Sequence, residues 1–146
     1  MRVYLDLCCL KRPFDAQVGE RVRLETEAMK ALLGADRGSL TFLRTRAHLL
    51  ENSLNPLLWR REAVRLWLEA GPLAPFDKDA IGIRTAALVS LGIAKFDALH
   101  LSSAEAAGAD VFVTADDRLR RRATALRPPL PFRVVDPLVF SGEVYP

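Results

Sequence analysis

The chain has 146 residues, of which half are hydrophobic and 27% are charged, so it is long enough for one domain with a buried core. Charged side chains interrupt every apolar stretch before it reaches the roughly 18 residues that a membrane-spanning helix needs. The two cysteines, Cys8 and Cys9, are adjacent, which excludes a disulfide framework or a structural zinc site and indicates small buried apolar side chains.

The N-terminal segment and the charge balance bear on localisation and substrate. The segment begins with a positive charge, as a signal peptide does, but its apolar part is short and contains Asp6. We therefore expect a cytoplasmic protein without a membrane partner. The net charge is only +3, and most basic side chains are arginines. Arginine suits phosphate recognition, but a GC-rich genome would give the same composition.

The first half of the chain alternates strand-like and helix-like segments. A buried strand is predicted at Arg2–Leu7 and is followed by loop-forming residues 11–15. A helix is predicted at Glu20–Leu33 with Gly34 as its stop, and then a strand at Ser39–Leu43. Two further helices follow, predicted at Arg46–Leu54 and Leu57–Ala70.

The second half continues this alternation. A third strand is predicted at Leu73–Phe76, and helices are predicted at Asp77–Leu91 and Lys95–Ala107, with Asp77 as an N-cap and Gly92 and Gly108 as stops. The last strands are predicted at Val111–Thr114 and Phe132–Val135, on either side of an arginine-rich helix at Asp116–Leu126. The residues beyond Pro137 are expected to form a short surface segment.

Strands separated by helices predict right-handed crossovers and a parallel sheet that is covered on both faces. In such sheets, ligands bind beyond the carboxyl ends of the strands, where the strand order reverses. Acidic residues at these ends are therefore candidates for a functional site.

Two aspartates follow predicted strands. Asp6 ends the apolar run Val3-Tyr4-Leu5, where an uncompensated carboxylate is costly. Asp116 lies just past the strand that begins at Val111, so the two carboxylates share one crevice if these strands are neighbours. Asp116 could also be only an N-cap of the following helix.

Two more acids interrupt apolar helices. Glu51 lies among Leu49, Leu50 and Leu54, and Asp97 lies in the first turn of its predicted helix. Glu51 could instead be exposed, and Asp97 could be only a partner of the helix dipole. Gathered together, however, the four carboxylates would repel one another unless they were protonated or bound a cation. Oxygen ligands without a histidine cluster favour Mg²⁺ or Mn²⁺ over zinc.

The histidines and tryptophans are assigned mainly structural positions. His48 is expected on the surface and His100 on a packed helix face, although either could carry a proton. Trp59 and Trp67 are about 80° apart on one predicted helix, which indicates core packing. Their exposure would instead suggest a dimer or a docked partner helix.

The order and spacing of five segments resemble the PIN-domain family, and more narrowly its VapC-like toxins of type II toxin–antitoxin pairs. The segments span nearly the whole chain: Val3-Tyr4-Leu5-Asp6, Arg12-Pro13-Phe14-Asp15, Glu51-Asn52-Ser53-Leu54-Asn55-Pro56, Asp97-Ala98-Leu99-His100 and Val113-Thr114-Ala115-Asp116-Asp117. The resemblance implies a single three-layer α/β/α domain over residues 1–146, with a mostly parallel sheet of about five strands.

The resemblance also implies a metal-dependent endoribonuclease that hydrolyses RNA phosphodiester bonds. Its Mg²⁺ or Mn²⁺ ligands, and hence its catalytic residues, would be Asp6, Glu51, Asp97 and Asp116. Thr114 would orient the acids, and Asp117 would be an auxiliary acid. Family members usually carry a small polar residue directly after the first Asp, and often Asn or Ser one position later, where this chain has Leu7 and Cys8.

A small antitoxin protein and a homodimer are the partners that the resemblance implies. On the helix that follows Asp116, an arginine run could guide RNA toward the acids, or be only a solvated face; its members assigned to RNA are Arg118, Arg121 and Arg122. The alternatives are a non-catalytic PIN-like RNA-binding module and a phosphoryl-transfer or response-regulator-like domain. The latter typically needs a lysine at a late strand end, which residues 132–137 lack.

Overall fold

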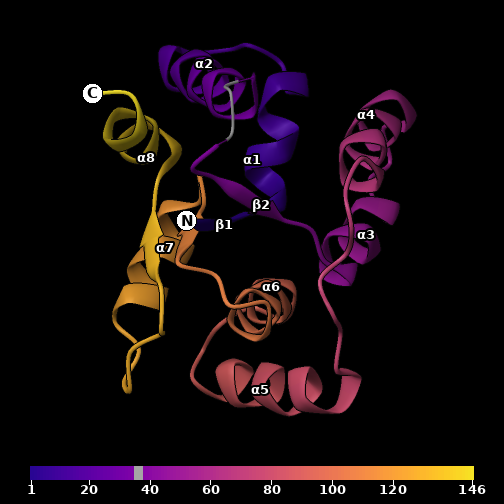
Figure 1. Ribbon diagram of the computed structural model, residues 1–146, viewed down its shortest axis with the longest axis vertical. Helices are drawn as coiled ribbons and strands as arrows, with labels where there is room; N and C mark the ends of the chain where they lie inside the picture. Colours follow the sequence, from indigo (N-terminus) through magenta and orange to yellow (C-terminus); the bar gives the residue numbers. More distant parts are fainter. Residues whose placement is uncertain (35–37) are drawn as a thin grey trace.

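The computed structural model describes residues 1–34 and 38–146 and has a mixed α/β fold (Figure 1). The strands are β1 (Arg2–Leu5), β2 (Thr41–Leu43), β3 (Val111–Val113) and β4 (Arg133–Val135). The helices are α1 (Leu7–Lys11), the 3₁₀ helix η1 (Arg12–Phe14), α2 (Glu20–Gly34), α3 (Arg46–Ser53), α4 (Leu58–Glu69), α5 (Lys78–Ser90), α6 (Lys95–Ala106), α7 (Asp117–Thr124) and α8 (Pro137–Val144).

The strands form one sheet in the order β2-β1-β3-β4, and each neighbouring pair is parallel. The predicted parallel α/β architecture is therefore confirmed, with four strands among the described residues where about five were expected. The chain moves from β1 to β2 on one side and later returns to β3 on the other side of β1. The strand order thus reverses between β1 and β3, which is where ligands bind in open α/β sheets.

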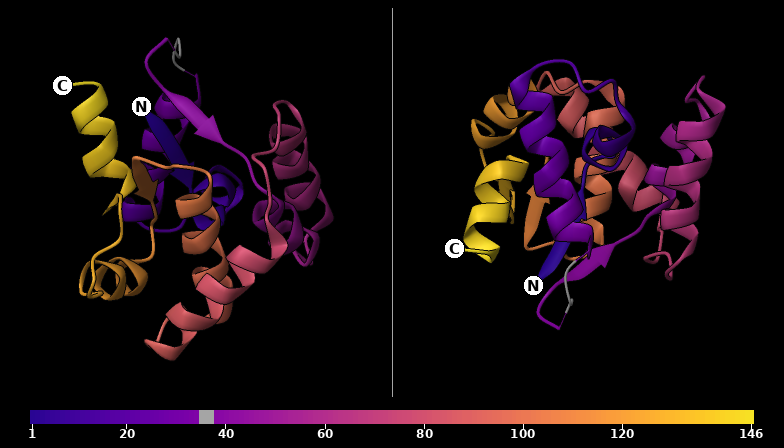
Figure 2. Two further views of the ribbon diagram at one scale, coloured as in Figure 1. Left: turned by 60° about the horizontal axis from the view of Figure 1, so that its bottom comes forward. Right: turned by 90° about the horizontal axis from the view of Figure 1, so that it is seen from above.

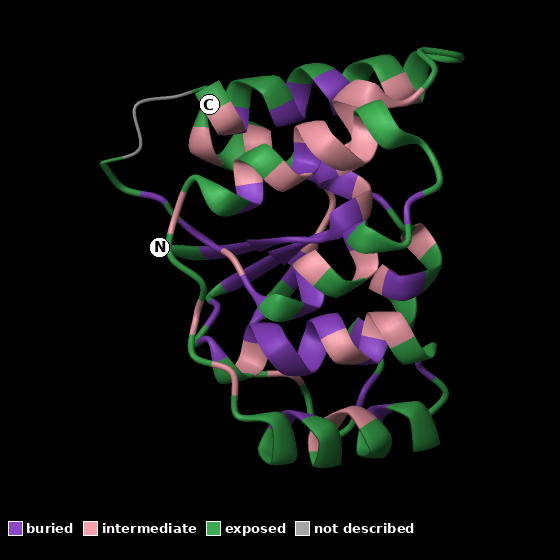
Figure 3. Cartoon of the chain, turned by 90° about the vertical axis from the view of Figure 1, so that its right-hand side faces the viewer, coloured by how far each residue is buried: buried purple, intermediate pink, exposed green. Residues whose placement is uncertain are grey.

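Alternating side chains of each strand enter two separate hydrophobic clusters, one on each face of the sheet. Val3 and Leu5 lie in the first cluster and Tyr4 in the second, while β3 repeats this pattern with Val111 and Phe112. Burial on both faces explains why the strands read as continuous apolar runs. Figure 3 shows these strands buried between helical layers.

Helices from different parts of the chain supply the two layers. On the first face, Met29 of α2, Val64 of α4 and Phe140 of α8 complete the cluster. On the second face, Leu101 of α6 and Leu119 of α7 do so. Helix α5 packs on α6 as the outermost element (Figures 1 and 3). The arrangement is the three-layer α/β/α fold.

The predicted helix ends have the expected physical causes. Asp77 accepts a hydrogen bond from Ala80 N at 3.1 Å and caps α5. Gly92 and Gly108 follow α5 and α6 with φ of +95° and +72°, a left-handed conformation that glycine adopts without a steric penalty.

The strand predicted at Leu73–Phe76 is wrong, because this segment has no regular structure. Pro72 and Pro75 remove backbone donors that a strand would use. A backbone hydrogen bond of 2.7 Å from Ala74 N to Arg44 O holds the segment against the end of β2.

Two other segments are more ordered than expected. The residues after Pro137 form α8, which packs beside α2 (Figure 2) and buries Phe140 to 1% exposure. Asp136 caps this helix by accepting from Val139 N at 2.9 Å. The predicted loop at residues 11–15 is mostly occupied by the end of α1 and by η1.

Three predicted side-chain positions are also corrected. His48 is fully buried rather than on the surface, because its ring nitrogens find backbone and side-chain partners inside the protein. Trp59 is 57% exposed rather than packed, whereas Trp67 packs against the first cluster. Cys9 is buried as expected, but Cys8 is only partly buried. Among the described residues, no helix is long and apolar enough to cross a membrane.

Candidate active site

Asp6 begins the candidate site, directly after β1 at the point where the strand order reverses. The side chain is 5% exposed and caps α1 by accepting from Leu7 N at 2.8 Å. Its second oxygen accepts from Thr114 Oγ1 at 2.7 Å and from Cys8 Sγ at 3.3 Å. These bonds compensate the buried charge, as a carboxylate inside an apolar strand end requires.

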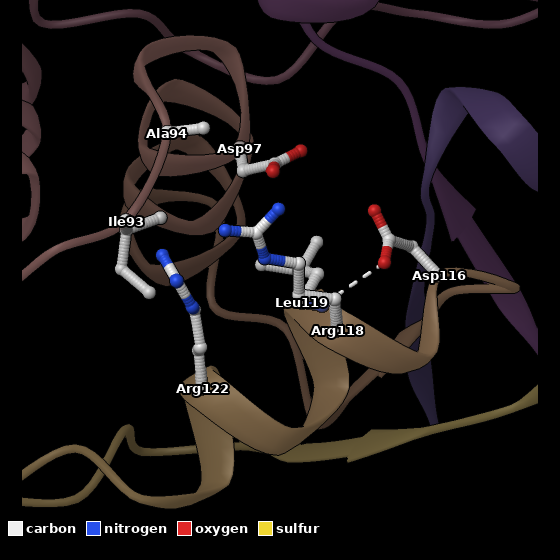
Figure 4. A pocket seen from close by; sticks show the side chains of 7 residues that line it. All are labelled: Ile93, Ala94, Asp97, Asp116, Arg118, Leu119 and Arg122. Atoms are coloured by element: carbon white, nitrogen blue, oxygen red, sulfur yellow. Dashed lines mark hydrogen bonds between the residues drawn. The ribbon is translucent and has the colours of Figure 1, made fainter.

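Asp116 lies beyond the neighbouring strand β3, at the same edge of the sheet. One oxygen caps α7 by accepting from Leu119 N at 3.0 Å, as Figure 4 shows. Thr114 joins the two aspartates, because its hydroxyl donates to Asp6 and accepts from Asp116 N at 3.1 Å. Asp116 is therefore an N-cap and also a neighbour of Asp6.

Asp97 comes from the first turn of α6 and, with Asp116, lines a cavity of about 210 Å³. No hydrogen bond or ion pair from the described residues reaches its carboxylate. Burial, followed by the negative charges of Asp6, Asp116 and Glu51, raises the pKa of Asp97 to about 6. These four acids, from here on the acidic cluster, are thus within electrostatic reach of one another.

Glu51 lies on α3 at the other side of the cluster. Its Oε1 is 3.5 Å from Nε2 of the buried His100. Burial works to raise the pKa of Glu51, but His100 and the charge of Lys11 outweigh it, so the pKa lies below its usual value. Glu51 also lines a second hollow of about 300 Å³, together with Lys11, Arg60 and Phe96.

The donor chemistry of the acidic cluster fits a divalent cation, since carboxylates are the ligands that Mg²⁺ and Mn²⁺ prefer. The excess negative charge around Asp97 fits it too. The side chains are not, however, arranged as a complete set of metal ligands. Within residues 1–34 and 38–146, no three His, Cys, Asp or Glu side chains are arranged to hold a metal ion.

Asp117 belongs to a network of ion pairs. Its carboxylate lies 2.6 Å from Arg21 and 2.9 Å from Arg120. The hydrogen bond from Arg21 and the charges of both arginines lower the pKa of Asp117 to about 2. Its contacts are those of a structural acid.

The arginines of α7 also fall into two groups, one held in ion pairs and one near the acidic cluster. Arg120 is committed to Asp117 and Asp136, at 2.9 and 3.6 Å. Arg118 and Arg122 line the cavity of Asp97, and Figure 4 shows the Arg118 guanidinium extending toward the two aspartates. Arg122 also donates to Gly92 O at 2.6 Å, and Arg121 is exposed.

Two residues of the site were missed in the sequence. Cys8 contacts both Asp6 and Thr114, with its sulfur 3.5 Å from the threonine hydroxyl. Its position two residues after the aspartate, where the resembling family often has Asn or Ser, was the available signal. Tyr4 was taken as part of an apolar run, and its hydroxyl contacts could not be inferred from the strand pattern.

Fold and site together define an α/β protein with an acidic site at the carboxyl edge of a parallel sheet. The family model of the PIN domain matches residues 39–125, which is more than half of the chain and includes Glu51, Asp97 and Asp116. The chain therefore belongs to the PIN-domain family, whose members are typically metal-dependent nucleases. No curated protein matches the chain.

Proposed function

We propose that the protein is a metal-dependent endoribonuclease, organised as one PIN-like domain over residues 1–146. The observation that carries the proposal is the environment of Asp97: burial, followed by three other carboxylates, raises its pKa to about 6, and no described cation pairs with it. A protein gains nothing in stability from such repulsion, whereas a site that binds a cation uses it. Family membership supports nuclease activity on RNA.

Mg²⁺ or Mn²⁺ would be held by the acidic cluster, with Asp97 and Asp6 as the principal ligands. A bound divalent ion supplies a water of lowered pKa and stabilises charge on a phosphate. Thr114 holds the orientation of Asp6 through the 2.7 Å bond, and Glu51 and Asp116 complete the negative field. Hydrolysis of this kind leaves 5′-phosphate and 3′-hydroxyl ends.

The RNA backbone would approach along α7. Arg118 and Arg122 border the same cavity as Asp97 and Asp116, so phosphate contacts and the acids lie side by side (Figure 4). Arg121 adds an exposed positive charge on the same helix. Such contacts give salt-dependent affinity with little sequence preference.

Cleavage of RNA in the presence of Mn²⁺ tests the proposal. Asp97→Asn removes a negative charge while keeping the side-chain shape, and we expect it to lower the cleavage rate by about a hundredfold or more. Asp117→Asn is the matched control, because it alters a neighbouring acid that is paired with arginines. Equal rates for wild type and Asp97→Asn would reject the assignment.

A non-catalytic RNA-binding PIN-like module is the second candidate, favoured by the absence of a closed three-ligand group among the described residues. It would bind RNA in a salt-dependent manner without metal-stimulated cleavage. The same assay, with RNA binding measured in parallel, separates the two functions.

The further proposal is a VapC-like toxin that is neutralised by a small antitoxin protein and forms a homodimer. Its support is the exposed apolar surface around the start of α4, where Leu58 is 60% and Trp59 is 57% exposed. Exposed apolar groups of this size are common at protein interfaces. A short reading frame next to the gene and a dimeric mass in light scattering are the expected findings.

A further inference from the structure

A layer of buried polar side chains lies beneath the acidic cluster. It consists of Tyr4 in β1, Thr45 at the start of α3, His48 in α3 and His100 in α6, all 2% exposed or less. Their hydrogen bonds join the three elements that supply or lead to Asp6, Glu51 and Asp97. We call these four residues the polar layer.

His48 anchors the polar layer to the backbone. Its Nε2 lies 2.8 Å from Leu5 O, which can only accept, so Nε2 carries the proton. Its Nδ1 accepts from Thr45 N at 3.1 Å. Both ring nitrogens thus have partners, and α3 is fixed to the residue directly before Asp6.

Tyr4 connects this anchor to His100. Its hydroxyl is 2.6 Å from His100 Nδ1 and 3.1 Å from Thr45 Oγ1. The 2.6 Å separation is short for an N–H donor and typical of a hydroxyl that donates. With Tyr4 as the donor, His100 Nδ1 is an acceptor, and the Thr45 hydroxyl lies 3.1 Å from two acceptors, Tyr4 Oη and His48 Nδ1. Neutral His100 then carries its proton on Nε2.

The chain of bonds ends at the acidic cluster. His100 Nε2 is buried, has no hydrogen bond with any described residue, and lies 3.5 Å from Oε1 of Glu51. Most buried polar groups in proteins are hydrogen-bonded, because an open donor is costly. In the polar layer, His100 Nε2 has no such partner among the described residues, and the nearest carboxylate to it in the candidate site is that of Glu51.

We propose that Tyr4 and His100 are positioning residues for Glu51: Tyr4 fixes the tautomer of His100, and His100 presents its Nε2–H to the carboxylate. The inference rests on the proposed function, in which Glu51 belongs to the metal-binding set. A ligand whose partner is held in one tautomer keeps its orientation as the cation binds.

The tautomer can be measured without any activity. His48 and His100 are the only histidines, so ¹⁵N NMR of histidine-labelled protein gives two separable sets of ring signals. We expect the Nε2–H form for both rings in metal-free wild type. In Tyr4→Phe, His100 should become a mixture of tautomers while His48 is unchanged. A wild-type His100 in the Nδ1–H form would overturn the inference.

Metal affinity tests the consequence for Glu51. We expect Tyr4→Phe to weaken Mn²⁺ binding by about tenfold in calorimetric titration and to lower kcat with little change in KM. Phe112→Leu is the matched control, since Phe112 stacks on Tyr4 at 5.1 Å but has no polar atom. It should reduce thermal stability and leave Mn²⁺ affinity within about twofold of wild type.

Variants of His100 and a double variant of Tyr4 and Glu51 distinguish a positioning role from a role in packing alone. His100→Gln retains an amide donor near the Nε2 position and should keep more Mn²⁺ affinity than His100→Leu. In a Glu51→Gln background, Tyr4→Phe should weaken Mn²⁺ binding no further, since the acceptor of the chain is already altered. Additive effects, or equal losses for the two His100 variants, would overturn the inference.

The outcomes also separate this inference from the proposed function. Wild-type protein that neither binds Mn²⁺ nor cleaves RNA overturns both. Wild-type protein that does both, with Tyr4→Phe indistinguishable from Phe112→Leu, overturns only the positioning role.

Discussion

The molecule holds acidic side chains in two regions that differ in their partners. In the acidic cluster, burial and then repulsion from the other three carboxylates raise the pKa of Asp97 to about 6. A second set alternates with arginines in what we call the ion-pair ladder, which runs through Arg60, Asp15, Arg12, Glu25, Arg21, Asp117, Arg120 and Asp136.

The two regions contribute differently to the protein. The ladder links α4, η1, α2 and α7 through neutralised charges, and the pKa of its member Asp117 falls to about 2. The cluster keeps excess negative charge around Asp97 at the edge of the sheet, which costs stability and fits the cation that we propose for this site. The same residue type is therefore paired with arginines in one region and placed among other carboxylates in the other.

The largest expected effect on stability comes from breaking the ladder at Glu25. This side chain is 2% exposed and pairs with Arg12 at 2.8 Å and Arg21 at 2.6 Å. Glu25→Gln removes the buried charge that joins the two guanidinium groups, although Arg12 keeps Asp15 and Arg21 keeps Asp117, and we expect a loss of about 2 kcal/mol in unfolding free energy by urea denaturation. Glu27→Gln, at an exposed ion pair on the same helix, should cost less than about 0.5 kcal/mol. Similar losses for both variants would contradict the comparison.

A divalent cation should stabilise the folded protein by binding to the acidic cluster and not to the ion-pair ladder. At ten times its dissociation constant, Mn²⁺ adds about 1.4 kcal/mol to unfolding free energy, or roughly 4 °C in Tm. Removal of the ion by EDTA should reverse the shift. Asp97→Asn should abolish the Mn²⁺-dependent shift, whereas Asp117→Asn should retain it; a full shift in Asp97→Asn would place the ion elsewhere.

The pH dependence of stability should have opposite sign in the two regions. Since the pKa of Asp97 is raised from 3.8 to about 6, the folded state binds more protons than the unfolded state between these values. Its contribution to stability is therefore present at low pH and lost as pH rises through 6. For Asp117, whose pKa is lowered, the contribution is present above pH 4 and lost as pH falls toward 2.

The sign is checked by comparing metal-free wild type with Asp97→Asn. The variant should be more stable at pH 8, by about 1 kcal/mol because solvent screens this half-buried side chain, and the gap should close toward pH 4. A variant that is less stable than wild type at pH 8 would show that the carboxylate is stabilised in the folded protein.

The smallest expected effects come from substitutions of two arginines of α7. Arg121 is exposed and outside the ladder, so Arg121→Glu should weaken RNA binding roughly threefold at low salt with little change in stability. Arg120→Gln removes a ladder contact and should lower stability more than RNA affinity. Fluorescence anisotropy and urea denaturation on both variants test this; identical profiles would argue against a division of roles.

Local patterns were sufficient for most of the fold. Short apolar runs and period-3.6 patterns with glycine stops predicted every strand that the structure describes and the order of α2 to α7, because each depends on residues close together in the chain. The strand prediction at Leu73–Phe76 was wrong because Pro72 and Pro75 lack the backbone N–H groups that a strand needs, although the segment is apolar. Helix α8 was missed because its stability comes from Phe140 packing next to α2, a contact between the two ends of the chain.

The sequence by itself determined the parallel α/β class and the candidacy of Asp6 and Asp116, because a carboxylate just beyond a buried strand lies at a predictable edge of a sheet. Only the tertiary structure decided that Asp97 has no ion pair with any described residue while Asp117 is neutralised, and that His48 and His100 are buried with Tyr4 between them. The physical reason is that charge repulsion and hydrogen bonding depend on distances between residues up to about a hundred positions apart, and no local pattern in a chain encodes those distances.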